Sequence, residues 1–380
     1  MKILFLIRSL ENGGAERQLA ALANELGRRN HDVAVGVFRR GGVHEGSLDP
    51  RYVRLIFIDK DHPASFGIRL LRTVRRERPD VLHGYLSAGN IAATLARTVA
   101  PRAKLVWGIR DSDMEYAKYS RTTQITYRVA ARMARFADLM IFNSDAGLRY
   151  WRDRGCAIPS SVSIPNGIDV RRFAPDRAAR RRMRAQWGIP EHVPVIGAVG
   201  RFDPMKDHET FLRAAALAIE EVPGLRPVIV GGGSPEIGSR LKSLASELNL
   251  AGSVVWQAPT QDMQAVYNAL DVFCLSSSNG EGFPNVVGEA MACGCRCVVT
   301  DVGDAAFVVG SLGTVVPPRD PRALAKAWLD ALVASVPRPA EIRGRVVENF
   351  TVERLADRTE DVLCSSATAA LRTDTAFSAH

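Results

Sequence analysis

The sequence predicts an α/β chain built from two doubly wound domains of parallel strands, which face each other across a cleft. Three observations support this prediction: the length, the composition, and an alternation of strand-like and helix-like segments that stops midway and starts again. A chain of 380 residues suits two domains of ordinary size. The hydrophobic fraction of 46% is typical of a packed globular protein, and no apolar run approaches the ~20 residues of a membrane-spanning helix.

The first alternation begins at the N-terminus. Residues 1–8 form an almost continuous apolar run, typical of a strand covered on both faces, and a Gly-Gly turn then opens a helix. Because parallel strands are joined by crossover helices, we expect the segments that follow to complete a parallel sheet. The predicted strands are 33–38, 53–58, 81–83, 104–109 and 139–143, and the predicted helices lie near 67–77, 89–99 and 122–136.

The alternation of strand-like and helix-like segments is interrupted between about residues 158 and 190. A Pro-Asn-Gly turn at 165–167 leads into an Arg-rich segment, which predicts the interdomain connection at 171–190. A second alternation then predicts strands at 195–199, 227–230, 254–257, 271–275, 297–300 and 314–316, with helices near 208–221, 236–248, 262–269, 284–293, 321–334 and 352–364. The predicted domains are therefore 1–170 and 191–350, followed by a C-terminal helix at 351–364, placed to pack back on the first domain, and by a disordered tail at 365–380.

The strongest chemical signal follows a predicted strand and opens a helix. It reads Glu281-Gly282-Phe283-Pro284-Asn285-Val286-Val287-Gly288-Glu289 and continues with Ala-Met-Ala-Cys-Gly. In parallel sheets the carboxyl ends of the strands and the helix N-termini converge on the cleft, so this segment is expected to face a ligand. Pro284 suits a first helical turn, and the free N–H groups of the residues that follow it, up to 287, can hold a phosphate. Glu281 precedes the helix and would face a reacting sugar, whereas Glu289 could reach a hydroxyl pair such as that of a ribose.

Two further segments also follow predicted strands. Gly200-Arg201-Phe202-Asp203-Pro204-Met205-Lys206 places two cations where they can stabilise the negative charge that grows on a departing diphosphate. Gly13-Gly14 lies between the first strand and its helix, and Gly14 would let the backbone approach a ligand. No G-x-G-x-x-G fingerprint accompanies it, which counts against a dinucleotide site and hence against a nicotinamide-dependent oxidoreductase.

The paired-glutamate segment resembles the E-x7-E signature of the family 4 retaining glycosyltransferases (glycosyl transferases group 1), which have the two-lobed GT-B fold with Rossmann-like domains. The resemblance implies that Glu281 contacts the donor sugar and that Glu289 binds the ribose of the nucleotide. Arg201 and Lys206 resemble the family's diphosphate-binding pair, so the implied catalytic residues are Glu281, Arg201 and Lys206. The implied donor contacts are Gly14, Gly200, Gly232, Gly282, Phe283, Pro284, Asn285, Val286 and Glu289.

The chain departs from this family on the acceptor side. Many members carry a His after a strand of the N-terminal lobe, close to the transferred sugar, whereas here the strand at 105–109 is followed by Arg110 and Asp111. Either residue could replace that His as a contact to the sugar, the phosphate or the acceptor. His83, which ends an earlier predicted strand, is a further candidate, although a lone His at a strand end equally suits a packed core residue.

The predicted reaction moves a hexose-type sugar from a UDP-, GDP- or related nucleotide sugar to a hydroxyl, with the anomeric configuration retained. The products would be cell-surface polysaccharide, lipopolysaccharide or glycolipid. No cofactor and no metal are expected, because the C-terminal lobe places no Asp-x-Asp on a strand end and the spacing of Cys293, Cys295 and Cys297 does not suit a metal site. A GT-B nucleotide-sugar epimerase and a non-catalytic nucleotide-sugar-binding protein are the alternatives.

The net charge of +9 is distributed unevenly along the chain. Residues 1–175 hold 29 Lys and Arg against 17 Asp and Glu, a balance of +12, and the remaining residues hold 21 against 24, a balance of −3. A basic N-terminal half favours an anionic partner, such as a membrane surface that carries a lipid-linked or glycan acceptor, and a solvated helix face is the equal alternative. The basic clusters lack the interleaved aromatic residues of a nucleic-acid platform, so no nucleic acid is expected. Without an export signal, the predicted location is cytoplasmic, at the inner face of the membrane.

Overall fold

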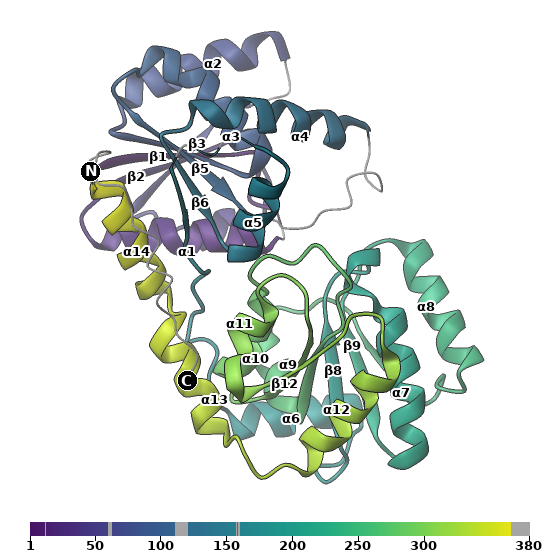
Figure 1. The fold of residues 1–380 in the computed structure, drawn as a ribbon. Helices are drawn as coiled ribbons and strands as arrows, with labels where there is room; N and C mark the ends of the chain where they lie inside the picture. Colours follow the sequence, from purple (N-terminus) through teal and green to yellow (C-terminus); the bar gives the residue numbers. More distant parts are fainter. Residues whose placement is uncertain (12, 60–62, 111–120, 157, 159, 366–380) are drawn as a thin grey trace.

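The computed structural model shows two lobes, each built around one parallel sheet with helices packed on it (Figure 1). It describes residues 1–11, 13–59, 63–110, 121–156, 158 and 160–365. The predicted fold class, two doubly wound α/β domains, is confirmed. The tail predicted at 365–380 lies outside the described residues, apart from residue 365 itself.

The N-terminal lobe contains a 7-stranded sheet in the order β3-β2-β1-β4-β5-β6-β7, with every pair parallel. Its strands are almost wholly apolar because helices cover both faces. The order reverses between β1 and β4, so the loops after these two strands diverge at the sheet's carboxyl edge. The strands are β1 (Lys2–Ile7), β2 (Asp32–Val37), β3 (Val53–Phe57), β4 (Val81–Tyr85), β5 (Lys104–Ile109), β6 (Leu139–Phe142) and β7 (Ser161–Ser163); the helices are α1 (Gly14–Arg28), α2 (Pro63–Glu77), α3 (Leu86–Ala96), α4 (Arg121–Met133) and α5 (Asp145–Asp153).

The C-terminal lobe contains a 6-stranded parallel sheet in the order β10-β9-β8-β11-β12-β13. Its order reverses between β8 and β11, and the loops after these two strands carry the segments 200–206 and 276–284. The strands are β8 (Val195–Val199), β9 (Arg226–Val230), β10 (Val255–Gln257), β11 (Val272–Leu275), β12 (Arg296–Thr300) and β13 (Thr314–Val316); the helices are α6 (Arg177–Trp187), α7 (His208–Glu221), α8 (Pro235–Glu247), α9 (Met263–Ala269), α10 (Asn285–Ala292), α11 (Ala305–Val309), α12 (Pro321–Val333) and α13 (Pro339–Asn349).

Helix α6 occupies much of the segment where we expected the connection between the domains. Its N-terminus is capped by Asp176, and it ends at Gly188, which adopts a left-handed conformation with a φ of 67°. We expected this Arg-rich segment to connect the domains, but it forms a helix in which the side chain of Arg184 is only 1% exposed. That guanidinium pairs with Asp271 at 2.7 Å and donates to the carbonyl of Ala269, so its burial is compensated. Strand β7 and helices α5, α11 and α13 were likewise not predicted.

The chain crosses between the lobes twice, and the two crossings lie side by side. Ile164 belongs to the N-terminal core and Ile168 to the C-terminal core, so the first crossing falls between them. The second leads from Phe350 into helix α14 (Val352–Cys364), which runs along the N-terminal lobe (Figure 1). The Ile168 N–H donates to the Phe350 carbonyl at 2.7 Å, which ties the crossings together.

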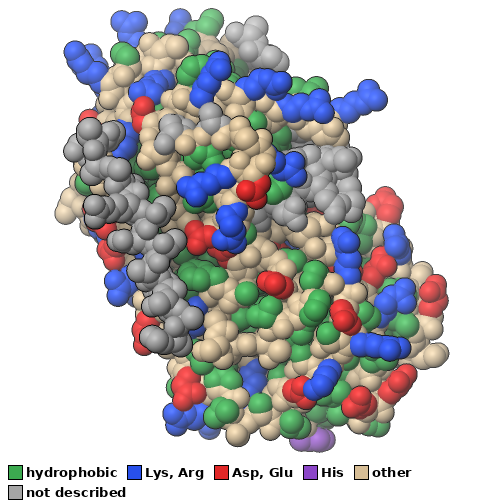
Figure 2. Space-filling view, viewed as in Figure 1, with side chains coloured by type: hydrophobic (Ala, Val, Ile, Leu, Met, Phe, Trp, Pro, Cys, Tyr) green, Lys and Arg blue, Asp and Glu red, His purple; other side chains and the backbone are tan. Residues whose placement is uncertain are grey.

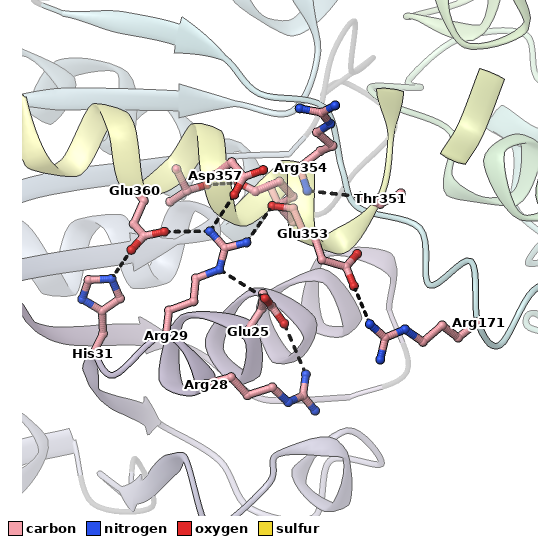
Figure 3. A network of polar contacts seen from close by, with 12 residues as sticks. Glu25, Arg28, Arg29, His31, Arg171, Thr351, Glu353, Arg354, Asp357 and Glu360 are labelled. Atoms are coloured by element: carbon pink, nitrogen blue, oxygen red, sulfur yellow. Dashed lines mark hydrogen bonds and ion pairs between the residues drawn. The ribbon is translucent and has the colours of Figure 1, made fainter. Parts of the chain in front are cut away.

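Helix α14 packs against α1 through Leu355, Ala356, Val362 and Leu363, and a polar network covers this contact (Figure 3). Arg29 is its centre, with donor–acceptor distances of 2.7 Å to both Asp357 and Glu360 and 3.1 Å to Glu25. The ring of His31 lies 2.6 Å from Glu360. Although partial burial opposes the shift, the hydrogen bonds from Arg29 and His31 hold the pKa of Glu360 below its usual value.

We expect Arg29→Ala to lower the free energy of unfolding by about 1–2 kcal/mol, because three carboxylates lose a shared, partly buried partner. Urea unfolding followed by tryptophan fluorescence would measure the change. Arg28→Ala is the matched control, since Arg28 is 50% exposed and, apart from lying over the Tyr52 ring, forms an ion pair with Glu25 alone among the described residues. The pKa of Glu360 is lowered in the folded protein, so this stabilisation should be present above the usual carboxyl pKa of 4.5 and fade as the pH falls below it. Equal losses in the two variants would contradict the central role of Arg29.

Candidate active site

Two loops at the strand-order reversal of the C-terminal sheet bring Lys206 and Glu281 together. The Nζ of Lys206 lies 2.5 Å from Oε1 of Glu281, and the Ser277 hydroxyl donates to the same oxygen at 2.6 Å. Glu281 is only 6% exposed, so its charge is held by these partners rather than by water. The Ser276 hydroxyl also donates to the Lys206 carbonyl at 2.9 Å, which ties the two loops to each other. A cation and a carboxylate, both predicted as catalytic, are therefore fixed side by side.

The other predicted catalytic residue, Arg201, is not part of this pair. Its side chain is 72% exposed, and the carboxylate that the structure places near it is Asp203, at 3.8 Å. Burial raises the pKa of Glu16, and the nearby positive charge of Arg201 partly opposes that shift. Glu16 lies in the first turn of α1, so Arg201 borders the space between the lobes.

The glycine loop after β9 supports the loop that carries Arg201 and Lys206. A Cβ on Gly231 would lie 1.9 Å from the Gly200 carbonyl oxygen, so only glycine fits there. The carbonyl of Gly232, the residue predicted from the sequence, accepts from the Phe202 N–H at 2.7 Å. The close approach that requires a glycine is therefore at Gly231.

Helix α10 begins at Asn285, one residue later than predicted, and Pro284 is its N-cap. No side chain of the described residues caps this helix end, so it keeps donors for a ligand. Phe283 points into the core of its own lobe, where its ring packs 5.4 Å from that of Phe350. Val286 also packs against that core. In this stretch the backbone at the start of α10 is available to a ligand, whereas the side chains of Phe283 and Val286 pack in the core and hold the segment in place.

The first turn of α1 rests on the first turn of α10. A Cβ on Gly14 would lie 2.9 Å from Nδ2 of Asn285, which explains a glycine at this position. The Oδ1 of Asn285 accepts from the side chains of Asn166 at 2.9 Å and Gln18 at 3.4 Å. Gln18 also binds both backbone groups of Gly167, donating at 2.8 Å and accepting at 2.9 Å. Two helix N-termini, each with a positive end, therefore meet at one place in the cleft.

Glu289 is 2% exposed and has a partner for each oxygen. The Tyr267 hydroxyl donates to Oε2 at 2.8 Å, and Arg17 of the other lobe pairs with Oε1. Burial, reinforced by the charge of Glu289, raises the pKa of Tyr267 well above its usual value, so its hydroxyl remains a donor. Glu289 also lines a cavity of about 240 Å³ between the lobes, with Arg17, Gln261 and Arg172 among its walls.

The carboxyl edge of the N-terminal sheet approaches the Glu281 loop from the opposite side. Arg110 follows β5, and its guanidinium donates to the Tyr85 hydroxyl and, at 3.2 Å, to Oδ1 of Asn166. Asn143 follows the neighbouring strand β6, and a Cβ on Gly282 would lie 2.7 Å from its Oδ1. Arg110 is thus brought close to the site, whereas Asp111, the other candidate named with it, lies outside the described residues.

His83, the remaining acceptor-side candidate, is fully buried within β4. Its ring lies 5.0 Å from that of Phe5 and 5.3 Å from that of Tyr85. Burial, aided by the nearby positive charge of Arg110, lowers the pKa of His83 to about 3, so the ring is neutral at ordinary pH. The structure places His83 in the core and not at the cleft.

Several residues of this site were not singled out from the sequence. They are Arg17, Gln18, Asn143, Ser277 and Asp304, together with Asn166 and Tyr267, which were noted only within longer motifs. Asp304 reaches across the cleft and accepts from the Asp145 and Ala146 N–H groups at 2.8 and 3.0 Å, at the start of α5. Gln18 could have been suspected, since it lies one helical turn after Gly14. Neither Asn143 nor Asp304 leaves a comparable signal, because each acts through the opposite lobe.

Both halves of the chain match models of one enzyme group. Residues 12–172 match the model described as Glycosyltransferase Family 4, and residues 193–333 match that of the Glycosyl transferases group 1. A D-inositol 3-phosphate glycosyltransferase of Corynebacterium jeikeium is 37% identical over 208 residues, which is 52% of this chain and 48% of that protein. A GDP-mannose-dependent alpha-(1-6)-phosphatidylinositol monomannoside mannosyltransferase of Mycolicibacterium smegmatis is 34% identical over 242 residues, 60% of this chain and 61% of that protein. The match therefore spans only about half to three fifths of these relatives.

Solved structures share the fold over nearly the whole chain. Anabaena Alr3699/HepE in complex with UDP-glucose superposes with a TM-score of 0.84 at 23% identity, covering 96% of this chain and 99% of that one. Sucrose-phosphate synthase from Thermosynechococcus elongatus superposes with a TM-score of 0.75 at 20% identity, covering 95% and 98% of the two chains. At these identities the likeness concerns the two-lobed fold alone.

We expect Tyr267→Phe to lower the free energy of unfolding by about 2 kcal/mol, because the buried carboxylate of Glu289 loses a charge-assisted hydrogen bond. Chemical denaturation would measure it. The control is Tyr52→Phe, since Tyr52 is 37% exposed and its ring contacts persist in phenylalanine. A loss no larger than that of the control would show that the Tyr267 hydroxyl does not support Glu289.

Proposed function

This chain belongs to the family 4 glycosyltransferases of the glycosyl transferases group 1, and from that premise we propose that it transfers a hexose-type sugar from a nucleotide sugar to a hydroxyl, with the anomeric configuration retained. One observation carries the proposal: Lys206 and Glu281 are fixed together at the strand-order reversal, beside the meeting point of the α1 and α10 N-termini. Cations and helix N-termini suit a diphosphate, and a carboxylate suits a sugar that gains positive charge.

In the proposed reaction the bond between the anomeric carbon and the phosphate oxygen breaks heterolytically. Lys206 and the first turns of α1 and α10 stabilise the negative charge on the departing diphosphate. Glu281 stabilises the positive charge at the anomeric centre. The acceptor hydroxyl adds on the face that the phosphate leaves, and its proton passes to the leaving phosphate oxygen, so configuration is retained and charge is balanced. Arg201, at the rim, would join the diphosphate when donor binds.

The nucleoside is assigned to the cavity of about 240 Å³, because Glu289, the residue predicted to bind the ribose, lines that space. A ribose that forms hydrogen bonds with Glu289 would compete for its carboxylate oxygens with Arg17 and Tyr267. The proposal uses no metal and no cofactor, since Lys206 and the helix N-termini supply the positive charge that a metal would otherwise bring. One relative named above is a D-inositol 3-phosphate glycosyltransferase, and the other is a GDP-mannose-dependent phosphatidylinositol monomannoside mannosyltransferase. Their names support a nucleotide-sugar donor and a glycan or lipid-linked acceptor here.

Thermal-shift measurements with UDP, GDP, ADP and their sugars, with and without EDTA, test the donor site. A nucleotide at ~100 times its dissociation constant should stabilise the protein by about 2.7 kcal/mol. We expect one nucleotide to do so in the presence of EDTA, and Lys206→Ala to abolish the shift. Lys242→Ala, at an exposed position of α8, should leave it unchanged. Glu281→Gln should keep nucleotide binding while the turnover number falls by about 10²–10³-fold, as expected for an electrostatic contact to the transition state.

Three outcomes of these experiments would contradict parts of the proposed function. If no nucleotide shifts the melting temperature of the folded wild type, the donor site is absent and the proposal fails. If EDTA removes the shift, the proposed metal independence is wrong. Anomeric configuration is checked separately, by NMR of the first product formed; an inverted product would exclude the proposed same-face transfer.

The acceptor-side lobe is also proposed to dock on an anionic membrane. Helices α2 and α4 lie on the outer part of that lobe (Figure 1), where Lys and Arg side chains are dense (Figure 2). Exposed Arg72, Arg75 and Arg76 accompany the exposed apolar side chains of Ile68 and Ile125. Basic and apolar groups together suit a lipid headgroup region. In the described part of the chain, no helix combines the length and the apolarity that crossing a bilayer requires.

Vesicle sedimentation at low salt tests this docking. We expect binding to vesicles containing anionic lipid, weakening as salt screens the charges, and at least a tenfold loss on changing Arg72, Arg75 and Arg76 together to Glu. A matched triple change on the C-terminal lobe, at exposed Arg213, Arg240 and Lys242, should have little effect. If both triple variants lost vesicle binding equally, net charge alone would explain the effect, and the proposed docking face would be contradicted.

A further inference from the structure

Arg110 is a half-buried cation that has no counter-ion among the described residues. Its side chain is mostly enclosed, and its Nε is buried without a hydrogen-bond partner among the described residues. The two contacts of its guanidinium, to the Tyr85 hydroxyl and to Asn166, are with neutral groups. Its carbon Cζ also lies 4.5 Å from the centre of the Tyr85 ring. Within the described residues, no carboxylate pairs with it.

Arg184 shows how this chain compensates such a charge elsewhere. The side chain of Arg184 is even more deeply buried, at 1% exposed, but its guanidinium pairs with Asp271 at 2.7 Å and donates to backbone carbonyls, including those of Ala269 and Val193. Burying an unpaired ion is costly, so proteins normally supply either a carboxylate or a full set of acceptors. Arg110 has neither. The missing negative charge is therefore expected to come from a bound molecule.

The neighbours of Arg110 cannot provide that charge. Burial raises the pKa of Tyr85, so the hydroxyl stays protonated and neutral. His83, whose two ring nitrogens also lack partners in the described structure, is neutral because burial lowers its pKa to about 3. Asn143 and Asn166 carry neutral amides. The described groups around Arg110 are thus polar but uncharged.

The position of Arg110 indicates which molecule would bring the anion. Strands β5 and β6 are in register, with the Asn143 N–H donating to the Ile109 carbonyl at 3.1 Å, so Arg110 and Asn143 leave the sheet side by side. Asn143 approaches Gly282, next to Glu281, and Asn166 links Arg110 to Asn285. Arg110 therefore faces the segment between Glu281 and Asn285, where the proposed function places the reacting sugar and the incoming acceptor.

From this geometry we propose that Arg110 binds a second anionic group, a carboxylate or a phosphate, that is distinct from the donor diphosphate and is carried by one of the two substrates. The inference rests on the proposed transferase function and adds a substrate class to it. A planar guanidinium matches both groups, since their oxygens can accept two parallel hydrogen bonds. The anion comes either from a uronic acid as the transferred sugar or from a phosphate monoester on the acceptor.

Matched substrate pairs distinguish these two sources. The donor pairs are UDP-glucose with UDP-glucuronic acid and GDP-mannose with GDP-mannuronic acid. The acceptor pair is inositol with inositol phosphate. We expect the wild type to prefer the charged member of one pair by at least tenfold in kcat/KM, and Arg110→Gln to remove that preference by weakening the charged member alone. Arg110→Lys should keep part of it, since it keeps the charge but not the fork. Arg149→Gln, on exposed α5, is the control.

Each result has a defined reading. A preference confined to a donor pair or to the acceptor pair, and lost in Arg110→Gln, supports the inference and names the source. The inference is overturned if the wild type prefers no charged member, a comparison that needs no variant, or if Arg110→Gln weakens charged and neutral members equally, which would assign Arg110 to the diphosphate. Binding of UDP, GDP and ADP alone is measured in parallel. If the wild type binds none of them, the proposed function fails and this inference with it; if it binds UDP or GDP, a negative result concerns Arg110 only.

Discussion

The contact between the first turns of α1 and α10 fixes the geometry of the cleft. It joins two lobes that are otherwise separate cores, and it does so where both helices present their positive ends. A Cβ at Gly14 would lie 2.9 Å from Nδ2 of Asn285, so a side chain there would displace the Asn285 amide. Asn166 and Gln18 then hold the Asn285 amide in one orientation. The backbone donors, Lys206 and Glu281 are thereby placed around one small volume.

Charge pairing across this contact couples ligand binding to the arrangement of the lobes. Glu281 is paired within its own lobe, by Lys206, whereas Glu289 is paired with Arg17 of the opposite lobe. A hydroxyl pair that takes Glu289 would therefore compete with an ion pair between lobes, while a sugar at Glu281 would not. Binding at the two glutamates is expected to differ in this respect, although they share one short segment of sequence. Asp304, which caps α5 from across the cleft, adds a further link that any separation of the lobes must break.

Much of the donor-side site could be predicted from the sequence, because its residues directly follow strands and strand ends converge in a parallel fold. That reasoning placed Glu281, Lys206 and Asn285 at the cleft, but it could not resolve partners from the opposite lobe. Asn143 and Asp304 act across the cleft, and nothing in their local sequence records that. His83 illustrates the same limit, since its position at a strand end fits the core and the cleft equally well. The Arg-rich stretch of α6 suggested a linker because the sequence does not show which guanidinium is enclosed by carbonyls.

The place where the lobes are joined is part of the same polar system as the site. The Gln18 side chain forms hydrogen bonds with both backbone groups of Gly167 in the first crossing, and it donates to Asn285 at the start of α10. A Cβ on Gly167 would lie 2.6 Å from the Cα of Val352, so the second crossing is packed directly against the first. Rotation of the lobes about these crossings must therefore change either the hydrogen bonds between Gln18 and Gly167 or the hydrogen bond between Gln18 and Asn285. Because Asn166 also contacts Arg110, the same motion reaches the acceptor side. The two crossings, the proposed diphosphate site and Arg110 are thus connected by three side-chain amides, those of Gln18, Asn166 and Asn285. A change in the angle between the lobes would therefore also change the geometry of the proposed transfer.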